Sequence, residues 1–235
     1  MIKRIYKYMP LREAFFDNFL LRVSGRDALN DPFEFFPSEL ILSDSLSDMY
    51  TQEELDDFVF SKYGVISFTE TRDNLLMWSH YGDNHKGFAV EFDYEHTFFH
   101  TTYSSESNDI EGSIHRVLYR KERFHELENE DGSAILELFF HKSDEWEYEK
   151  EHRLLASFKK TKSSKTLDIP NLKEEMFFCQ VPENAILSIT FGCKADCKVI
   201  ERLKDTLSKN PSCKHIKLCK AVASGTDYKL EFNSH

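Results

Sequence analysis

The sequence predicts an α+β protein with a mixed, strand-rich sheet core and peripheral helices. Three observations support this class: short apolar runs bounded by turn residues are frequent, segments of helical period lie among them, and the two types do not alternate regularly. The 235 residues are 40% hydrophobic and include 21 Phe and 10 Tyr, so the chain can bury a sizeable core. We expect one domain spanning residues 1–235, with a helical insertion at about 35–62.

Strands are expected where a short apolar or alternating run lies between glycine, proline or polar residues. The expected strands are 3–8, 19–23, 64–69, 87–93, 114–119, 147–153, 176–181, 186–191, 214–219 and 228–232. Pro10 ends the first of them. The segment 147–153 is included because its acids alternate and the apolar run 154–158 follows directly.

Helices are expected at 12–18, 38–49, 52–61, 75–82, 133–142 and 195–208. Apolar residues recur at helical spacing in the last two, and Gly82 closes the fourth. Before the helical insertion, Pro32 pushes Asp31 out of the helical region, which predicts a turn at 29–34.

The chain carries 30 Lys and Arg against 41 Asp and Glu, a formal net charge of −11. This balance disfavours an unspecific grip on duplex nucleic acid, which needs clustered cations. The dense basic run at 159–165 is interpreted as a solvated loop between strands, and it is also the nearest candidate for a local basic groove.

No apolar stretch approaches the length of a membrane span, and the N-terminus leads into no signal-peptide core. We therefore expect a cytoplasmic protein without a membrane partner. The cysteines are Cys179, Cys193, Cys197, Cys213 and Cys219. Their number is odd and their spacing is poor for zinc, so reduced thiols and no metal site are expected.

Several catalytic signatures are absent from the sequence. It contains no Gly-rich phosphate loop, no dinucleotide fingerprint of three glycines, no Gly-x-Ser-x-Gly and no His-Glu-x-x-His. A P-loop enzyme or a Rossmann dehydrogenase is therefore not expected.

The alternating acids at 147–153 are the first candidate site. On a strand, Glu147, Glu149, Glu151 and Arg153 would point to one face, with neighbouring acids roughly 6–7 Å apart. One interpretation is an exposed edge whose charges prevent edge-to-edge aggregation. The other is a pair of carboxylates facing a cleft, with Arg153 holding one of them ionised.

A second candidate is the segment 78–87, which is dense in functional side chains. Trp78 and Tyr81 offer stacking surfaces, while His80 and His85 offer hydrogen-bond donors or groups that titrate near neutral pH. The alternative is a turn that contains a core tryptophan and exposed histidines.

Six blocks of the sequence together resemble a bacterial family catalogued as domain of unknown function 2971. The blocks are Tyr-Lys-Tyr at 6–8, Leu-Asn-Asp-Pro-Phe-Glu at 29–34, Ile-Ser-Phe-Thr at 66–69, and the segments 76–87, 146–153 and 185–192. The resemblance spans nearly the whole chain, and it implies no activity by itself.

The order of parts also resembles that of ADP-ribosyltransferases. Tyr6 or Tyr8 on the first strand, Ser67-Phe68-Thr69, and Glu149-Lys150-Glu151 occupy the places of that family's three motifs, although Glu147 leaves the register of the acids open. The resemblance implies an ADP-ribosyltransferase-like fold and catalytic roles for Glu149 and Glu151. The side chains expected to contact NAD are Tyr6, Tyr8, Asn30, Ser67, Thr69, Trp78, His80, Tyr81 and Arg153.

This resemblance implies an enzyme that uses NAD as a substrate and modifies RNA or protein, as a toxin or phage-defence effector with a possible antitoxin partner. Glu151 would bind the ribose as positive charge develops on it, and Glu149 would serve the acceptor. We expect the two acids to face a concavity walled by Tyr8 and Trp78. The alternatives are a non-catalytic sensor that binds a nucleotide or partner, and an NAD glycohydrolase.

Overall fold

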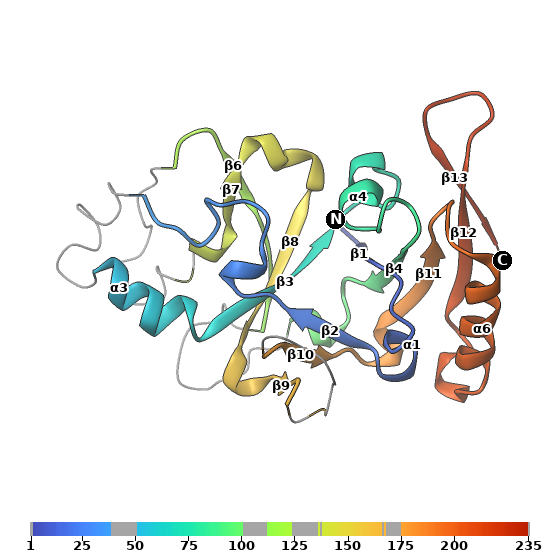
Figure 1. Ribbon diagram of the computed structural model, residues 1–235, viewed down its shortest axis with the longest axis horizontal. Helices are drawn as coiled ribbons and strands as arrows, with labels where there is room; N and C mark the ends of the chain where they lie inside the picture. Colours follow the sequence, from blue (N-terminus) through green and yellow to red (C-terminus); the bar gives the residue numbers. More distant parts are fainter. Residues whose placement is uncertain are drawn as a thin grey trace. The chain divides into compact units, whose positions relative to one another are not determined.

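The computed structural model describes residues 2–38, 51–100, 112–123, 136, 138–165, 167 and 175–234 (Figure 1). The contacts between Cα atoms divide the chain into two compact units, each built from separate segments. Unit 1 comprises Met1–Leu21, Phe68–Phe98 and Gln180–His235, and unit 2 comprises Arg22–Ser67 and Phe99–Cys179. Whether both form the single domain expected from the sequence stays a prediction.

Unit 1 is built on a mixed sheet with strand order β13-β12-β11-β4-β1. Its strands are β1 (Arg4–Met9), β4 (Phe88–Asp93), β11 (Ile186–Phe191), β12 (Lys217–Ala223) and β13 (Leu230–Ser234). The pair β11–β12 is parallel and the other pairs are antiparallel. The last two strands begin later than expected, at Lys217 and Leu230, and a 3₁₀ turn, η8 (Pro211–Cys213), lies before β12.

The helices of unit 1 pack aromatic and aliphatic side chains together. They are α1 (Phe15–Asn18), α4 (Leu75–His80), α6 (Cys197–Ser208) and the short 3₁₀ turns η7 (Glu183–Ala185) and η8. Asp196 caps α6 by accepting a hydrogen bond from the Lys198 amide at 2.7 Å. In the core, the Phe88 ring lies 5.5 Å from Phe15 and 5.1 Å from Phe16.

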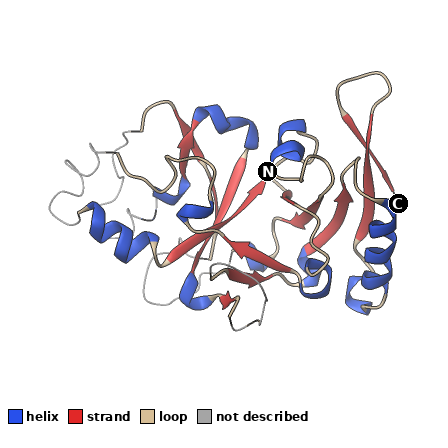
Figure 2. Cartoon of the chain, in the orientation of Figure 1, coloured by secondary structure: helices blue, strands red, loops and turns tan. Residues whose placement is uncertain are grey.

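Unit 2 contains three groups of paired strands. Its strands are β2 (Leu20–Val23), β3 (Tyr63–Thr69), β5 (Ile114–Arg116), β6 (Leu118–Arg120), β7 (His141–Ser143), β8 (Glu151–Ser157), β9 (Lys162–Ser163) and β10 (Phe177–Gln180), of which β2, β3 and β10 continue into unit 1. The neighbours are β3-β8-β5, β2-β10-β9, and the parallel pair β6–β7. Strands predominate over short helices, which confirms the α+β class (Figure 2).

The core of unit 2 is mainly phenylalanine and leucine. Its buried members are Phe35, Leu55, Val59, Phe60, Val65, Leu136, Leu138, Phe139, Phe140 and Leu155. The helical segments are η1 (Arg26–Ala28), α3 (Gln52–Leu55), the π-helical η2 (Asp56–Phe60), η4 (Leu138–Phe140), η5 (Asp144–Glu149) and η6 (Phe158–Lys160); η3 (Thr97–Phe99) crosses the boundary between the units. The helix expected at 52–61 is confirmed as α3 followed by η2.

The acidic segment was wrongly predicted as a continuous strand. Residues Asp144–Glu149 form the 3₁₀ helix η5, whose first turn is capped by Ser143, and the strand begins only at Glu151. Lys150 between them adopts a left-handed conformation with φ 45° and ψ 51°. The alternation of acids is therefore not a row on one strand face.

Some further expectations need correction, and others fall outside the described residues. The basic run is not a simple loop, since it contains η6 and β9. The predicted strand 114–119 is divided at Val117 into β5 and β6. Within the predicted helix 133–142, Leu136 is helical, but residues 138–140 form the 3₁₀ turn η4 and β7 follows; its start lies outside the described residues. The helix expected at 38–49 also lies almost wholly outside them.

Candidate functional site

Five charged side chains meet inside unit 2. We call this the charge cluster, and its members are Glu34, Lys142, Glu149, Glu151 and Arg153. Arg153 is fully buried, and Lys142, the most exposed member, retains 8% of its surface. Charged residues are rarely buried unless they are paired, so the pairing inside this cluster decides its stability.

Local turns bring the acids to the same place. Glu34 follows a turn in which Asp31 Oδ1 accepts a hydrogen bond from the Phe33 amide at 2.9 Å. This is the turn predicted from Pro32. The left-handed Lys150 reverses the chain between η5 and β8, so that Glu149 and Glu151 both reach Lys142 despite their different elements.

Arg153 fixes one side of the cluster with all three of its guanidinium nitrogens. Its Nε and Nη2 donate to the two carboxylate oxygens of Glu151 at 2.8 and 2.9 Å, a bidentate contact. Nη2 also donates to Glu34, and Nη1 donates to the Phe139 carbonyl oxygen at 2.7 Å. The planar guanidinium thereby orients Glu34 and Glu151 relative to each other.

Lys142 fixes the other side. Its Nζ lies 3.0 Å from Glu34, 2.6 Å from Glu149 and 3.4 Å from Glu151. It also lies 4.8 Å from the centre of the Trp146 ring, a cation–π contact. Among the three carboxylates, Glu151 is the one that Lys142 contacts at the longest distance.

Burial and charge divide the acids into two kinds. Burial opposes ionisation of Glu151, but Arg153 and Lys142 outweigh it and lower its pKa to about 2. At Glu34, burial outweighs the same two cations and raises the pKa. Burial acts against both cations as well, yet the surrounding carboxylates raise the pKa of Lys142 and of Arg153. Three acids face two cations, and at Glu34 the effect of burial prevails.

Two hydroxyl groups complete the surroundings of Glu151. The Ser67 side chain on β3 forms a hydrogen bond with the Glu151 carboxylate. The Tyr119 hydroxyl oxygen accepts a hydrogen bond from the Glu151 amide at 2.8 Å. Burial raises the pKa of Tyr119, so the phenol stays protonated near neutral pH.

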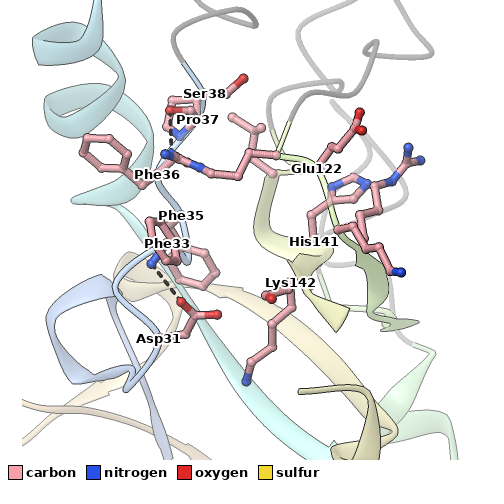
Figure 3. Close-up of a pocket in the computed structure, with 14 residues that line it drawn as sticks. Asp31, Phe33, Phe35, Phe36, Pro37, Ser38, Glu122, His141 and Lys142 are labelled. Atoms are coloured by element: carbon pink, nitrogen blue, oxygen red, sulfur yellow. Dashed lines mark hydrogen bonds between the residues drawn. The ribbon is translucent and has the colours of Figure 1, made fainter. Parts of the chain in front are cut away.

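A pocket of about 250 Å³ adjoins the charge cluster through Lys142, which belongs to both. Figure 3 shows the chain from Asp31 to Ser38 on one side of this pocket, opposite Glu122, His141 and Lys142. Its walls are aromatic and cationic; they comprise Asp31, Phe33, Phe35, Phe36, Pro37, Ser38, Arg120, Lys121, Glu122, Arg123, Leu138, His141, Lys142 and Ser143. The Arg123 guanidinium lies 5.1 Å from the Phe33 ring and 5.4 Å from the Phe36 ring.

The structure brings together four of the residues predicted for the site in unit 2. Ser67, Glu149, Glu151 and Arg153 lie in or against the charge cluster, whereas Asn30 is an exposed neighbour of the Asp31 turn. The sequence left open which two of the three acids at 147–151 belong to the site. Glu147 is exposed on η5, whereas Glu149 and Glu151 are buried.

The other predicted site residues lie in unit 1. Tyr6 stands opposite Thr69 in the β1–β3 pair, and His80 lies beside Tyr81 with ring centres 6.2 Å apart. Trp78 is fully buried and contacts Tyr8 edge-on, with ring centres 4.9 Å apart. The expected concavity between these rings and the acids stays a prediction.

Sequence reasoning missed Glu34, Lys142 and Asp31 as site residues. Glu34 and Asp31 stood in the quoted Asn-Asp-Pro-Phe-Glu block, where only the neighbouring Asn30 was chosen. Lys142 was assigned to a helix end. The available signal was a lysine two residues after the apolar run 138–140, since a charge close to such a run is often buried with a partner.

In the described part of the chain, no group of three or more His, Cys, Asp or Glu side chains is placed to hold a metal ion. All five cysteines are free thiols. No helix among the described residues is long and apolar enough to cross a bilayer.

Fold and site define an α+β protein whose second unit encloses a buried charge cluster beside an aromatic and cationic pocket. Residues 77–154, about a third of the chain, match the model of a family described as "Protein of unknown function (DUF2971)". The match includes Lys142, Glu149, Glu151 and Arg153, while Glu34 lies outside it. No curated protein and no solved structure matches the chain significantly.

Proposed function

We propose that unit 2 binds a nucleotide in the pocket beside the charge cluster. Phenylalanine rings offer flat apolar surfaces to a base, and Arg120, Lys121, Arg123 and Lys142 offer positive charge to phosphate groups. Ligand sites of this kind combine a mostly apolar wall with a few convergent polar groups. An overall acidic chain that gathers several cations around one cavity is suited to an anionic small molecule.

The reaction that we propose is transfer of ADP-ribose from NAD to RNA or protein. The bond between the ribose C1′ and nicotinamide breaks, and nicotinamide leaves with the electron pair. A nucleophilic oxygen or nitrogen of the acceptor then bonds to C1′ and gives up its proton to Glu149. Glu151 accepts a hydrogen bond from the ribose 2′-hydroxyl, which becomes stronger as positive charge develops on the sugar.

The contact between Ser67 and Glu151 is the observation that carries this proposal. It joins the middle-strand serine and the later glutamate that the resemblance to ADP-ribosyltransferases singled out. The lowered pKa of Glu151 keeps this carboxylate ionised over the whole physiological range. Because Lys142 lies 3.4 Å from Glu151 but 2.6 Å from Glu149, a ribose hydroxyl displaces the Glu151 contact more easily.

The test is incorporation of label from NAD into macromolecules of a cell extract. Glu151→Gln is expected to abolish labelling while circular dichroism shows a folded protein. Glu147→Gln is the matched control, because it makes the same change at an exposed acid outside the pocket. Ribonuclease and protease treatment then identifies the acceptor as RNA or protein. Labelling that persists when Glu149 and Glu151 are both replaced by Gln ends the transferase assignment.

One observation favours a second candidate, a non-catalytic nucleotide-binding module. Lys142 and Arg153 already contact the carboxylates of Glu149 and Glu151, and both acids are buried. A binding module would show a higher melting temperature with NAD, by mass action on the folded state, and would release no nicotinamide. Nicotinamide release without an acceptor would instead identify an NAD glycohydrolase.

A further inference from the structure

Asp31 holds a carboxylate oxygen that the fold leaves unsatisfied. The residue is 4% exposed, and its Oδ1 accepts the hydrogen bond from the Phe33 amide. Its Oδ2 is buried and has no hydrogen-bond partner among the described residues. Leaving such an atom unpaired is costly, and most buried polar atoms in folded proteins have a partner. Asp31 also lines the pocket, so a bound molecule can supply the missing donor.

The two ends of the pocket differ in chemistry. Figure 3 shows Asp31 and Lys142 toward one end, Phe33 and Phe35 between the ends, and Pro37 and Ser38 toward the other end. The Lys142 ammonium is already paired with three carboxylates. Arg123 belongs to the second end, because its Nη2 donates to the carbonyl oxygens of Phe36 and Pro37 at 2.8 and 3.2 Å. A nucleotide lying along the pocket therefore places its phosphate near Arg123 and its base between the rings near Asp31.

We propose that Asp31 selects a base that carries an exocyclic amino group, with adenine as the expected base. One amino N–H would donate to Oδ2, and a single free oxygen suits a single donor. A guanine edge, which offers two parallel donors, would need both oxygens, and Oδ1 is already engaged by the Phe33 amide. This inference rests on the proposed nucleotide binding and names the base within that site.

Binding of AMP and of purine riboside 5′-monophosphate tests the inference, since the second compound is AMP without its amino group. The unmodified protein is expected to bind AMP about 10- to 100-fold more tightly than the analogue, the range for a hydrogen bond to a charged group. Asp31→Asn is expected to remove this preference, because the side chain presents N–H groups or a neutral oxygen in place of Oδ2. Its affinity for the analogue should stay within about twofold.

Asp31→Asn keeps an oxygen for the Phe33 amide, so its melting temperature is expected to equal or exceed that of the unmodified protein. Glu147→Gln is the control with the same loss of charge at an exposed acid outside the pocket, and it should keep the preference for AMP. Equal binding of AMP and the analogue overturns the inference, as does failure of AMP to bind. A preference for AMP without any transfer from NAD supports the inference and refutes only the transferase reaction.

Discussion

Glu91 in unit 1 and Glu151 in unit 2 are buried to the same extent, each with 4% of its surface exposed. Each is contacted by a serine hydroxyl, from Ser188 and Ser67 respectively, and each pairs with an arginine. The arginines differ. The Arg4 side chain, 2.7 Å from Glu91, is 62% exposed, whereas the Arg153 side chain has no exposed surface.

This difference separates a peripheral ion pair from an internal one. Arg4 remains hydrated, so its attraction to Glu91 is largely screened by water. Arg153 and its partners have all lost water, and each ion is tolerated only because the others are present. Replacing a buried ion network by apolar side chains is often neutral or stabilising, so the charge cluster is better explained by a function than by stability.

Loss of the two arginines should give the largest contrast. Arg153→Met leaves Glu34 and Glu151 without their shared counter-ion, and we expect a loss of about 3–5 kcal/mol in the free energy of unfolding. Arg4→Met should cost below about 1 kcal/mol, since Arg4 is mostly solvated. Urea unfolding measures both.

Where Arg153→Met does not fold, adding Glu34→Gln and Glu151→Gln should restore folding, because the unpaired charges are then removed. Equal losses for Arg153→Met and Arg4→Met would mean that burial of the cation does not distinguish the two sites.

Lys142 should show a smaller but still large effect. Lys142→Met removes the ammonium from three carboxylates, and we expect a loss of about 3 kcal/mol in urea unfolding. Lys121→Met changes an exposed lysine of the same pocket and should stay within about 0.5 kcal/mol. Both changes should weaken AMP binding, so only the unfolding measurement separates the cluster from the pocket wall.

The decline of the unfolding free energy at low pH, which we call the acid limb, tests Glu151 directly. Its pKa is about 2 in the folded protein against an ordinary 4.5, so folding favours the ionised form. This stabilisation is complete above pH 4.5 and is lost as the pH falls toward 2, by about 3 kcal/mol in total. Urea unfolding between pH 2 and 7 should show this decline, and Glu151→Gln should flatten it.

Glu34 should behave in the opposite way. Burial raises its pKa, so its protonated form is favoured in the folded protein and its contribution is lost as the pH rises through the raised value. Glu34→Gln should therefore leave the acid limb in place and reduce the loss of stability at higher pH. An acid limb that is the same in Glu151→Gln and the unmodified protein would contradict the assignment to Glu151.

The sequence predicts the parts of this site better than their assembly. β-Branched and aromatic runs identify β3 correctly, and the proline turn correctly places Asp31 outside a helix. The alternating acids led to the wrong prediction of a strand. Acids at every second position do not require a strand, and here Ser143 caps a 3₁₀ helix that contains them.

The pairing of Arg153 with Glu34 had no local signal. The two residues are 119 positions apart, and their contact depends on tertiary packing that a short pattern does not contain. Lys142 was hidden partly for the same reason, since its partner Glu34 comes from a distant segment, although Glu149 and Glu151 lie only 7 and 9 positions away.

The two serines should give the smallest effect on stability and the sharpest division of function. Ser67→Ala and Ser188→Ala each remove one hydrogen bond to a buried glutamate, and each should cost about 1 kcal/mol in urea unfolding. Labelling from NAD should fall in Ser67→Ala, because Glu151 loses the hydroxyl that positions it, and should persist in Ser188→Ala. If both variants label equally well, Ser67 only stabilises the buried Glu151, as Ser188 stabilises Glu91. The Ser67 hydroxyl then has no part in catalysis.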